Sequence, residues 1–172
     1  MLVRSGYDAS HAMAVVLLRD RIGEHGRILV LGAGGGFELS VFARECQRWT
    51  FTGVDPSVEM LRQANVKLET VGASGRVSWV QGTVENSPRD PLDAATAFLV
   101  LNFVEDDPRI YAAFARRNGA PEDVVQRAVR MHRESLSYML PEREIALLGE
   151  AGFGDVRLFY TGLWVSGWIA RA

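Results

Sequence analysis

A glycine cluster that follows an apolar segment is the part of this chain best suited to bind a reactive ligand. Glycines stand at positions 32, 34, 35 and 36, directly after the apolar, β-branched-rich run from Ile28 to Leu31. Such a run is typical of a strand buried on both faces, and the glycines would join it to the helix that begins near Phe37. A junction of this kind offers unpaired N–H groups and a backbone without side chains. The pattern therefore predicts a turn that a nucleotide-like ligand can approach closely.

An acidic residue follows at the distance that a nucleotide site needs. Asp55 ends a second short strand-like segment, residues 51–55, and it stands roughly 20 residues after Gly36. A carboxylate at this place can accept hydrogen bonds from both hydroxyls of a ribose. A glycine cluster alone is weak support for a ligand, but strand, glycines, helix, strand and acid in this order favour nucleotide binding over a bare turn.

Hydrophobic periodicity predicts the elements that position these residues. Helices are expected over residues 8–22, from 37 onwards, from 58 to about 72, over 121–139 and from 141 to 152. In the last of them, Ile145, Leu147 and Leu148 are expected to face inward. Strands are expected over residues 28–31, 51–55, 77–81 and 93–101, and a hairpin over 155–160 and 163–171. The turn of that hairpin is predicted at Thr161 and Gly162.

Composition limits the class of protein. The 172 residues, 48% of them hydrophobic, predict a single domain over residues 1–172. A formal charge of −2 gives no electrostatic sign of a nucleic-acid binder and favours a small-molecule partner. Cys46 is the only cysteine, which fits a reducing cytoplasm and excludes a cysteine-based metal cluster, so no metal is expected. Neither a secretory leader nor an apolar run of membrane-spanning length is found, so the prediction is a cytoplasmic protein with no membrane partner.

The glycine spacing resembles that of class I S-adenosylmethionine (SAM) methyltransferases. A dinucleotide fingerprint would need its third glycine at the position of Phe37, whereas the glycines at 32, 34 and 36 are spaced one residue more tightly. The resemblance implies an α/β fold with a Rossmann-like, doubly wound, mostly parallel sheet and a C-terminal antiparallel hairpin. It also implies that S-adenosyl-L-methionine is the cofactor.

The resemblance further implies a set of cofactor contacts around the turn. The ribose would lie on Asp55, and Met60 would reach the adenine. Thr83 stands where the family often has an aspartate that accepts a hydrogen bond from the adenine amino group, so a hydroxyl would have to substitute here. The implied cofactor-binding residues are Tyr7, Gly32, Ala33, Gly34, Gly36, Asp55, Pro56, Met60, Gly82, Thr83, Val84, Ala97 and Phe98.

Other residues near the turn have two interpretations. By resemblance, the backbone around Ala97 and Phe98 would face the methionine part of SAM. Tyr7 could fold over the glycine turn or pack as an aromatic staple against the first helix. His11 is more often a packed or surface residue than a catalyst when it stands alone on an apolar helix. Methyl transfer from an activated donor needs alignment rather than a base, so no catalytic residue is named.

The two ends of the chain are similar to the carboxy-SAM synthase group, in residues 4–7 and from 114–119 to 150–153. That group makes carboxy-SAM from SAM and prephenate and holds the new carboxylate with an arginine. An ungapped match puts Val129 at that arginine, with Arg130 beside it. A second departure is Val30, where many class I members carry an acid that helps to hold the methionine amine.

A third departure lies between Asp107 and Tyr111, where only three residues stand in place of the helix and fifth strand of the family. Three alternatives follow for the edge that the fourth strand would then expose. The hairpin closes up beside this strand, a second copy of the chain fills the gap in a homodimer, or the natural chain has further residues there. We favour the last, because natural deletions seldom remove a central strand cleanly.

The sequence thus predicts a transferase, a SAM-dependent methyltransferase that acts on a small-molecule acceptor. Three alternatives stay open. They are a carboxy-SAM synthase-like enzyme, a SAM-binding protein without catalytic activity, and an interaction module that merely keeps the fold.

Overall fold

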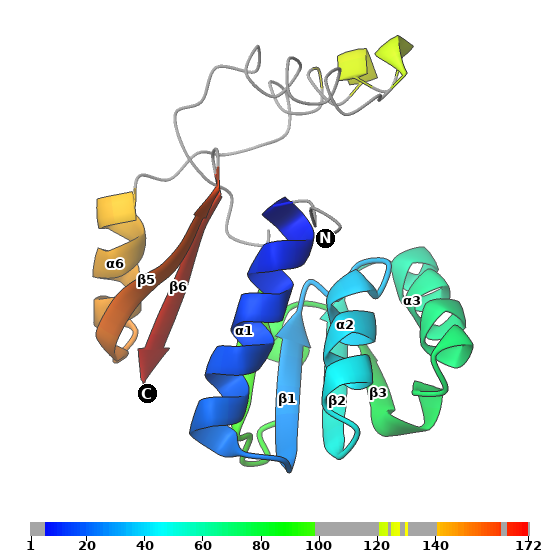
Figure 1. Ribbon diagram of the computed structural model, residues 1–172, viewed down its shortest axis with the longest axis horizontal. Helices are drawn as coiled ribbons and strands as arrows, with labels where there is room; N and C mark the ends of the chain where they lie inside the picture. The colour runs from blue at the N-terminus through cyan, green and yellow to red at the C-terminus, as the bar shows by residue number, and fades with distance from the viewer. Residues whose placement is uncertain are drawn as a thin grey trace, which may run out of the picture. The chain divides into compact units, whose positions relative to one another are not determined.

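The computed structural model describes residues 6–98, 121–123, 125–127, 130, 141–162 and 165–171. The chain divides into two compact units, Met1–Val100 and Leu101–Ala172, and each is described by itself (Figure 1). The single domain expected from the sequence stays a prediction.

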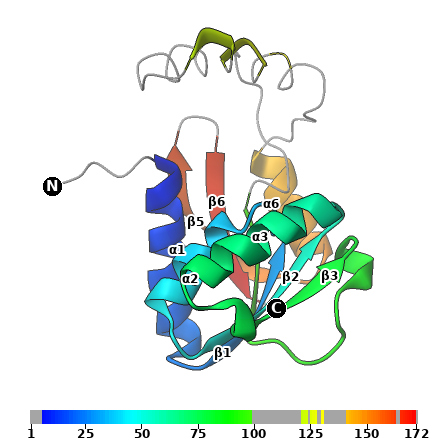
Figure 2. The same cartoon turned by 90° about the vertical axis from the view of Figure 1, so that its right-hand side faces the viewer.

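The first unit is a four-stranded parallel sheet covered by helices (Figures 1 and 2). Its strands are β1 (Gly26–Leu31), β2 (Trp49–Asp55), β3 (Val77–Gln81) and β4 (Ala94–Ala97), in the spatial order β3-β2-β1-β4. Its helices are α1 (Gly6–Ile22), α2 (Phe37–Glu45), α3 (Val58–Thr70) and the short 3₁₀ turns η1 (Ser74–Arg76) and η2 (Val84–Asn86). The chain winds outward from β1 to β3 and then crosses to the other side of β1. This reversal of strand order is the point where α/β sheets bind ligands, beyond the carboxyl ends of their strands.

The core of this unit forms where the apolar runs of the sequence meet. Ile28 and Val30 of β1 are completely buried, as are Leu39 and Phe42 of α2. Trp49 is the largest of the fully buried side chains, and its indole N–H donates to the carbonyl of Gly23 at 3.0 Å. The alternation of strands and helices therefore produces a doubly wound sheet, as the sequence predicts.

Arg76 joins the carboxyl end of α2 to β2, a role that the sequence pattern did not indicate. Its guanidinium donates to the carbonyls of Ala43 at 2.7 Å and of Cys46 and Trp49 at 3.0 Å each. Carbonyls at the end of a helix lack partners within the helix, and a positive charge there complements the helix dipole. Arg76 thus stabilises the junction between a helix and the central sheet.

We expect Arg76→Ala to lower the free energy of unfolding by about 3 kcal/mol, because charge-assisted hydrogen bonds contribute on the order of 1.5–3 kcal/mol each and do not add fully. Urea unfolding measures this loss. The control is Arg62→Ala, which removes an exposed ion pair with Glu59 on α3 and should leave stability nearly unchanged, because water and salt screen such pairs. Equal effects of the two variants would contradict the role of Arg76.

The second unit contains helix α6 (Pro141–Glu150) and an antiparallel hairpin of β5 (Gly154–Gly162) and β6 (Val165–Arg171). Residues 122–123, 125–127 and 130 are also helical. Gly152, with φ at 91°, follows α6 in the left-handed conformation predicted for it. The predicted C-terminal hairpin is therefore present as a two-stranded sheet.

Two predictions in this unit are wrong. Thr161 and Gly162 are not the hairpin turn, because they lie in β5 and pair with Ser166 and Val165 of β6. The cross-strand register continues past the residues that a local turn signal had favoured. Residues 163–164, between the two strands, lie outside the described part of the chain.

The inward face of α6 also differs from the prediction. Ile145 is 41% exposed, whereas the neighbouring Glu144 is only 3% exposed. The indole N–H of Trp168 donates to the Glu144 carboxylate at 2.7 Å, which gives the buried acid a partner. Burial raises the pKa of Glu144, while this hydrogen bond opposes the shift.

The fourth strand is shorter than predicted and less buried. Asp93 precedes β4, and its carboxylate accepts a hydrogen bond from the backbone N–H of Arg27 at 2.8 Å. Within the described sheet β4 pairs with β1 and occupies the edge, and its residues alternate between half-buried and exposed. The junction of Asp107 and Pro108, position 129 and most of the helix predicted over 121–139 lie outside the described residues.

Candidate functional site

The predicted glycine turn lies at the carboxyl end of β1 and connects it to α2. Gly32, Gly34 and Gly36 have φ values of 65°, 49° and 75°, which are left-handed conformations that favour glycine. A Cβ on Gly36 would lie 2.8 Å from the Cα of Ala64 in α3, whereas a Cβ on Gly35 would meet nothing within 4 Å. Gly36 therefore allows two helices to pack closely, and Gly35 leaves the outer side of the turn open.

Asp55 connects the loops that follow β1, β2 and β3. Its side chain is buried, and its two oxygens accept hydrogen bonds from the backbone N–H groups of Gly34 at 2.8 Å and Ser57 at 2.9 Å. Its own carbonyl accepts from the N–H of Gly82 at 3.1 Å. Each carboxylate oxygen has a second lone pair, so ligand hydroxyls can still bind there. The predicted acid is thus a structural partner of the turn as well as a candidate ligand residue.

The other residues predicted after β2 and β3 lie at the same edge of the sheet. Pro56 and Met60 are exposed at the start of α3, where the Ser57 hydroxyl accepts a hydrogen bond from the Met60 N–H at 3.3 Å. Thr83 caps η2 through a capping box with Asn86, and its hydroxyl also contacts Glu85. Val84 is exposed. Their contacts with a cofactor stay predictions.

His11 packs between aromatic residues next to the glycine turn. It is completely buried, its ring stacks on Phe98 with a centroid distance of 4.2 Å, and it meets Phe37 edge-on at 5.2 Å. This agrees with the interpretation of His11 as a packed residue. Ala97 is exposed at the end of β4. Tyr7 lies in the first turn of α1, but its side chain is outside the described part of the structure.

Glu38 is a candidate residue that sequence reasoning missed. It lies in the first turn of α2, is only 5% exposed, and accepts a hydrogen bond from the hydroxyl of Thr96 in β4. Burial raises the pKa of this carboxyl to about 8, against a smaller opposing effect of the Thr96 hydrogen bond. A signal was present, because Glu38 stands four and eight residues before the buried Phe42 and Cys46 and therefore on the same helix face.

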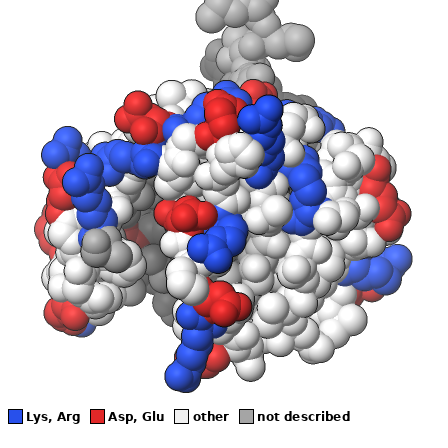
Figure 3. All heavy atoms as spheres, turned by 90° about the horizontal axis from the view of Figure 1, so that it is seen from below, with Lys and Arg blue, Asp and Glu red and all other residues white. Residues whose placement is uncertain are grey.

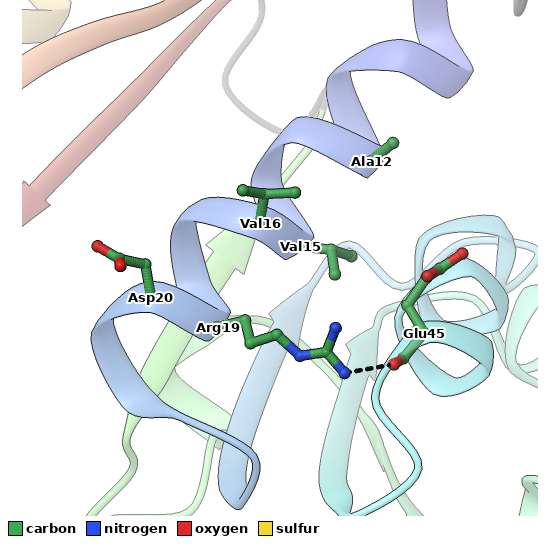
Figure 4. A pocket seen from close by; sticks show the side chains of 6 residues that line it. All are labelled: Ala12, Val15, Val16, Arg19, Asp20 and Glu45. Atoms are coloured by element: carbon green, nitrogen blue, oxygen red, sulfur yellow. Dashed lines mark hydrogen bonds between the residues drawn. The ribbon is translucent and has the colours of Figure 1, made fainter.

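Two hollows of the described surface lie away from the glycine turn. One of about 560 Å³ opens between α1 and α2 and is lined by Ala12, Val15, Val16, Arg19, Asp20 and Glu45 (Figure 4). There Arg19 donates to the carbonyl of Glu45 at 3.0 Å. Another, of about 370 Å³, lies at the amino ends of the strands, beside Arg27 and Thr50. Ligands of parallel sheets bind at the opposite, carboxyl ends of the strands. The glycine turn is therefore a better candidate for the ligand site than either hollow.

On the face shown in Figure 3, basic and acidic side chains are interspersed among uncharged ones. No group of three or more His, Cys, Asp or Glu side chains in the described part of the chain could hold a metal ion. Of the helices described, none has both the length and the apolar character of a membrane span.

The fold is shared with solved methyltransferase structures. SibL, a SAM-dependent methyltransferase in its apo form, has a TM-score of 0.61 and 17% identity over 94% of this chain and 54% of its own. The YcgJ protein from Bacillus subtilis has a TM-score of 0.61 and 18% identity, over 88% of this chain and 70% of its own. A SAM-dependent methyltransferase from Thiobacillus denitrificans in complex with S-adenosyl-L-homocysteine has a TM-score of 0.54 and 19% identity, over 88% of this chain and 66% of its own. Identities this low show the fold alone, and they confirm the predicted class I Rossmann-like architecture.

The comparisons differ in how much of the chain and of its relatives they cover. The chain spans about half the length of SibL. No curated protein matches the sequence, and the similarity of the chain ends to the carboxy-SAM synthase group is not shown by any of these comparisons. A family model described as a methyltransferase domain matches residues 28–118, which is just over half of the chain and includes most of β1, the glycine turn and Asp55. The chain therefore belongs to the methyltransferase domain family.

Proposed function

We propose that this protein is a SAM-dependent methyltransferase that acts on a small-molecule acceptor. The observation that carries the proposal is the open glycine turn, tied through Gly34 to the buried carboxylate of Asp55 at the switch point of the sheet. The solved structure with bound S-adenosylhomocysteine supports SAM as the cofactor. Family membership supports the transfer of a methyl group.

The residues present fit this cofactor. A side chain on Gly35 would meet no protein atom within 4 Å, so the backbone there is accessible to a ligand. Asp55 has lone pairs left for ribose hydroxyls after bonding Gly34 and Ser57. The exposed side chain of Met60 lies in the first turn of α3, whose N-cap residue Ser57 bonds this carboxylate, and from there it can cover an adenine.

SAM, when bound, supplies a methyl group on a sulfonium that is already activated for in-line displacement. The glycine turn and Asp55 would hold the donor in one orientation. Alignment of this kind can lower a barrier by roughly 7–11 kcal/mol without a catalytic base.

Calorimetry with S-adenosylhomocysteine tests the proposal. We expect saturable binding at micromolar concentrations and no binding of NAD, because Phe37 takes the place of the third glycine that lets a helix pack close to a pyrophosphate. Saturable NAD binding would contradict the proposal. Turnover is then measured as S-adenosylhomocysteine released from SAM with mixtures of small-molecule acceptors.

The turnover experiment also separates the alternatives. Binding without release of S-adenosylhomocysteine from any acceptor mixture would favour a SAM-binding protein without catalysis. Consumption of prephenate in the presence of SAM would favour a carboxy-SAM synthase-like enzyme. A homodimer, a cytoplasmic location and the absence of a nucleic-acid partner stay predictions from the sequence.

A further inference from the structure

The hollow of about 370 Å³ at the amino ends of the strands has polar groups where a doubly wound sheet is normally apolar. Phe51 of β2 is buried, so Thr50 and Thr52 on either side of it point to the other face of the sheet. Thr50 is exposed and Thr52 is half-buried, although strands covered on both faces are apolar on both. The polar residues of this amino-end hollow are Arg27, Thr50, Thr52, Arg76, Ser78 and Asp90.

The register of the sheet extends the polar surface across neighbouring strands. Ser78 of β3 pairs with Thr52, and Arg27 of β1 pairs with Thr50, so the members of each pair lie side by side. Within the described chain no hydrogen bond occupies the hydroxyls of these two threonines and of Ser78. A hydroxyl can both donate and accept. The amino-end hollow can therefore bind polar groups of either kind.

An arginine and an aspartate line the amino-end hollow without forming an ion pair. Among the described residues neither Arg76 nor Asp90 has a partner of opposite charge. Arg76 makes its bonds to backbone carbonyls instead, through N–H groups of its two terminal nitrogens, so the N–H on Nε is left for a ligand. Arg27, by contrast, is paired with Asp93 at 3.7 Å. One positive and one negative charge thus stay available.

The loop that carries Asp90 is tied to the sheet before any ligand binds. Pro88 and Pro91 line the hollow from this loop and restrict its backbone. At its end the Asp93 carboxylate accepts from the N–H of Arg27 at 2.8 Å, and the Asp93 N–H donates to the Arg27 carbonyl at 3.0 Å. A preformed wall lowers the entropy cost of binding.

We propose that the amino-end hollow binds a free amino acid, at a site separate from that of the cofactor. The α-carboxylate would bind Arg76 through charge-assisted hydrogen bonds, the α-ammonium would bind Asp90, and the hydroxyls of Thr52 and Ser78 would bind polar atoms between them. A hollow of about 370 Å³ can hold a ligand of this size. Thr52 lies about 10 Å before Asp55 along β2. The ligand is therefore out of reach of a methyl group held at the carboxyl ends of the strands.

Unfolding midpoints of the full chain, measured with each common amino acid in turn, test the proposal. We expect at least one amino acid to raise the midpoint, and calorimetry then gives its affinity with S-adenosylhomocysteine present in excess to fill the cofactor site. The matching amine without the carboxylate and the matching acid without the ammonium should each bind at least tenfold more weakly. No shift with any amino acid, or equal binding of either analogue, would overturn the inference.

Isosteric variants show whether the amino acid binds in this hollow. Asp90→Asn should weaken its binding by at least tenfold and Thr52→Val by about threefold, with the affinity for S-adenosylhomocysteine unchanged. The control is Asp20→Asn, because Asp20 is an exposed acid that lines the hollow between α1 and α2 instead. Equal losses in the Asp90 and Asp20 variants would contradict the placement. So would release of S-adenosylhomocysteine from SAM on addition of the amino acid, since the amino acid would then be the methyl acceptor.

Discussion

Asp55→Ala is expected to lower the affinity of the protein for S-adenosylhomocysteine by at least tenfold, and 5′-methylthioadenosine should lose affinity to the same extent because it has the same ribose. Each charge-assisted hydrogen bond to a ribose hydroxyl contributes on the order of 1.5–3 kcal/mol, and a tenfold loss corresponds to about 1.4 kcal/mol. The variant also releases the N–H groups of Gly34 and Ser57 that the carboxylate holds in the free protein. Calorimetry with both ligands measures the effect.

A matched control separates the loss of the ligand contact from a general loss of stability. Asp93 likewise stands at a strand end and accepts a hydrogen bond from a backbone N–H, that of Arg27, but at the amino ends of the strands. Asp93→Ala should lower the free energy of unfolding without changing the affinity for either ligand. Unchanged affinity of the Asp55 variant, with the protein still folded, would reject the placement of the ribose.

Gly36→Ala is expected to destabilise the first unit by roughly 2–5 kcal/mol, the sum of the left-handed backbone strain and of overpacking. The φ of 75° disfavours any residue with a Cβ, and that Cβ would lie 2.8 Å from both the Cα and the Cβ of Ala64. Domains are stable by only about 5–15 kcal/mol. Urea unfolding of the variant therefore should show a large shift of the midpoint.

Two other glycines separate the two contributions. Gly72 has a φ of 66° but nothing within 4 Å of an added Cβ, so Gly72→Ala should cost only the backbone strain of about 1–2 kcal/mol. Gly35 also has open space around it, and Gly35→Ala should leave stability nearly unchanged. If Gly36→Ala proved no worse than Gly72→Ala, the close packing of α3 on the turn would not matter for stability.

The glycine turn and the strands around it could be predicted from the sequence, because short local patterns encode them. The glycine turn, the strands on either side of it and Asp55 follow from hydrophobic runs and from the backbone freedom of glycine, which act within a few residues. The structure accordingly has β1, β2 and β3 within two residues of the predicted ranges. The turn has an open side and Asp55 ends β2, as the sequence predicts, while the contacts of these residues with a cofactor stay predictions.

The features that sequence reasoning missed depend on partners far along the chain. Glu144 is buried because Trp168 donates to it, 24 residues away, and Glu38 is buried against Thr96, 58 residues away. A periodic pattern shows which helix face is apolar, but it does not show which strand will supply a hydrogen-bond donor to an acid on that face. The hairpin turn was misplaced for the same reason, since cross-strand pairing fixes where β5 ends.

The strand order also determines when each strand can find its pairing partner during synthesis on the ribosome. Strand β1 acquires β2 as a neighbour early, but its other neighbour is β4, and the bond between Arg27 and Asp93 joins residues 66 positions apart. At about 5–20 residues per second, β1 waits roughly 3–13 s with one edge unpaired. During that interval an extended, apolar segment is available to chaperones that bind nascent chains. The nascent first unit can complete its parallel sheet only after Ala97 has been made.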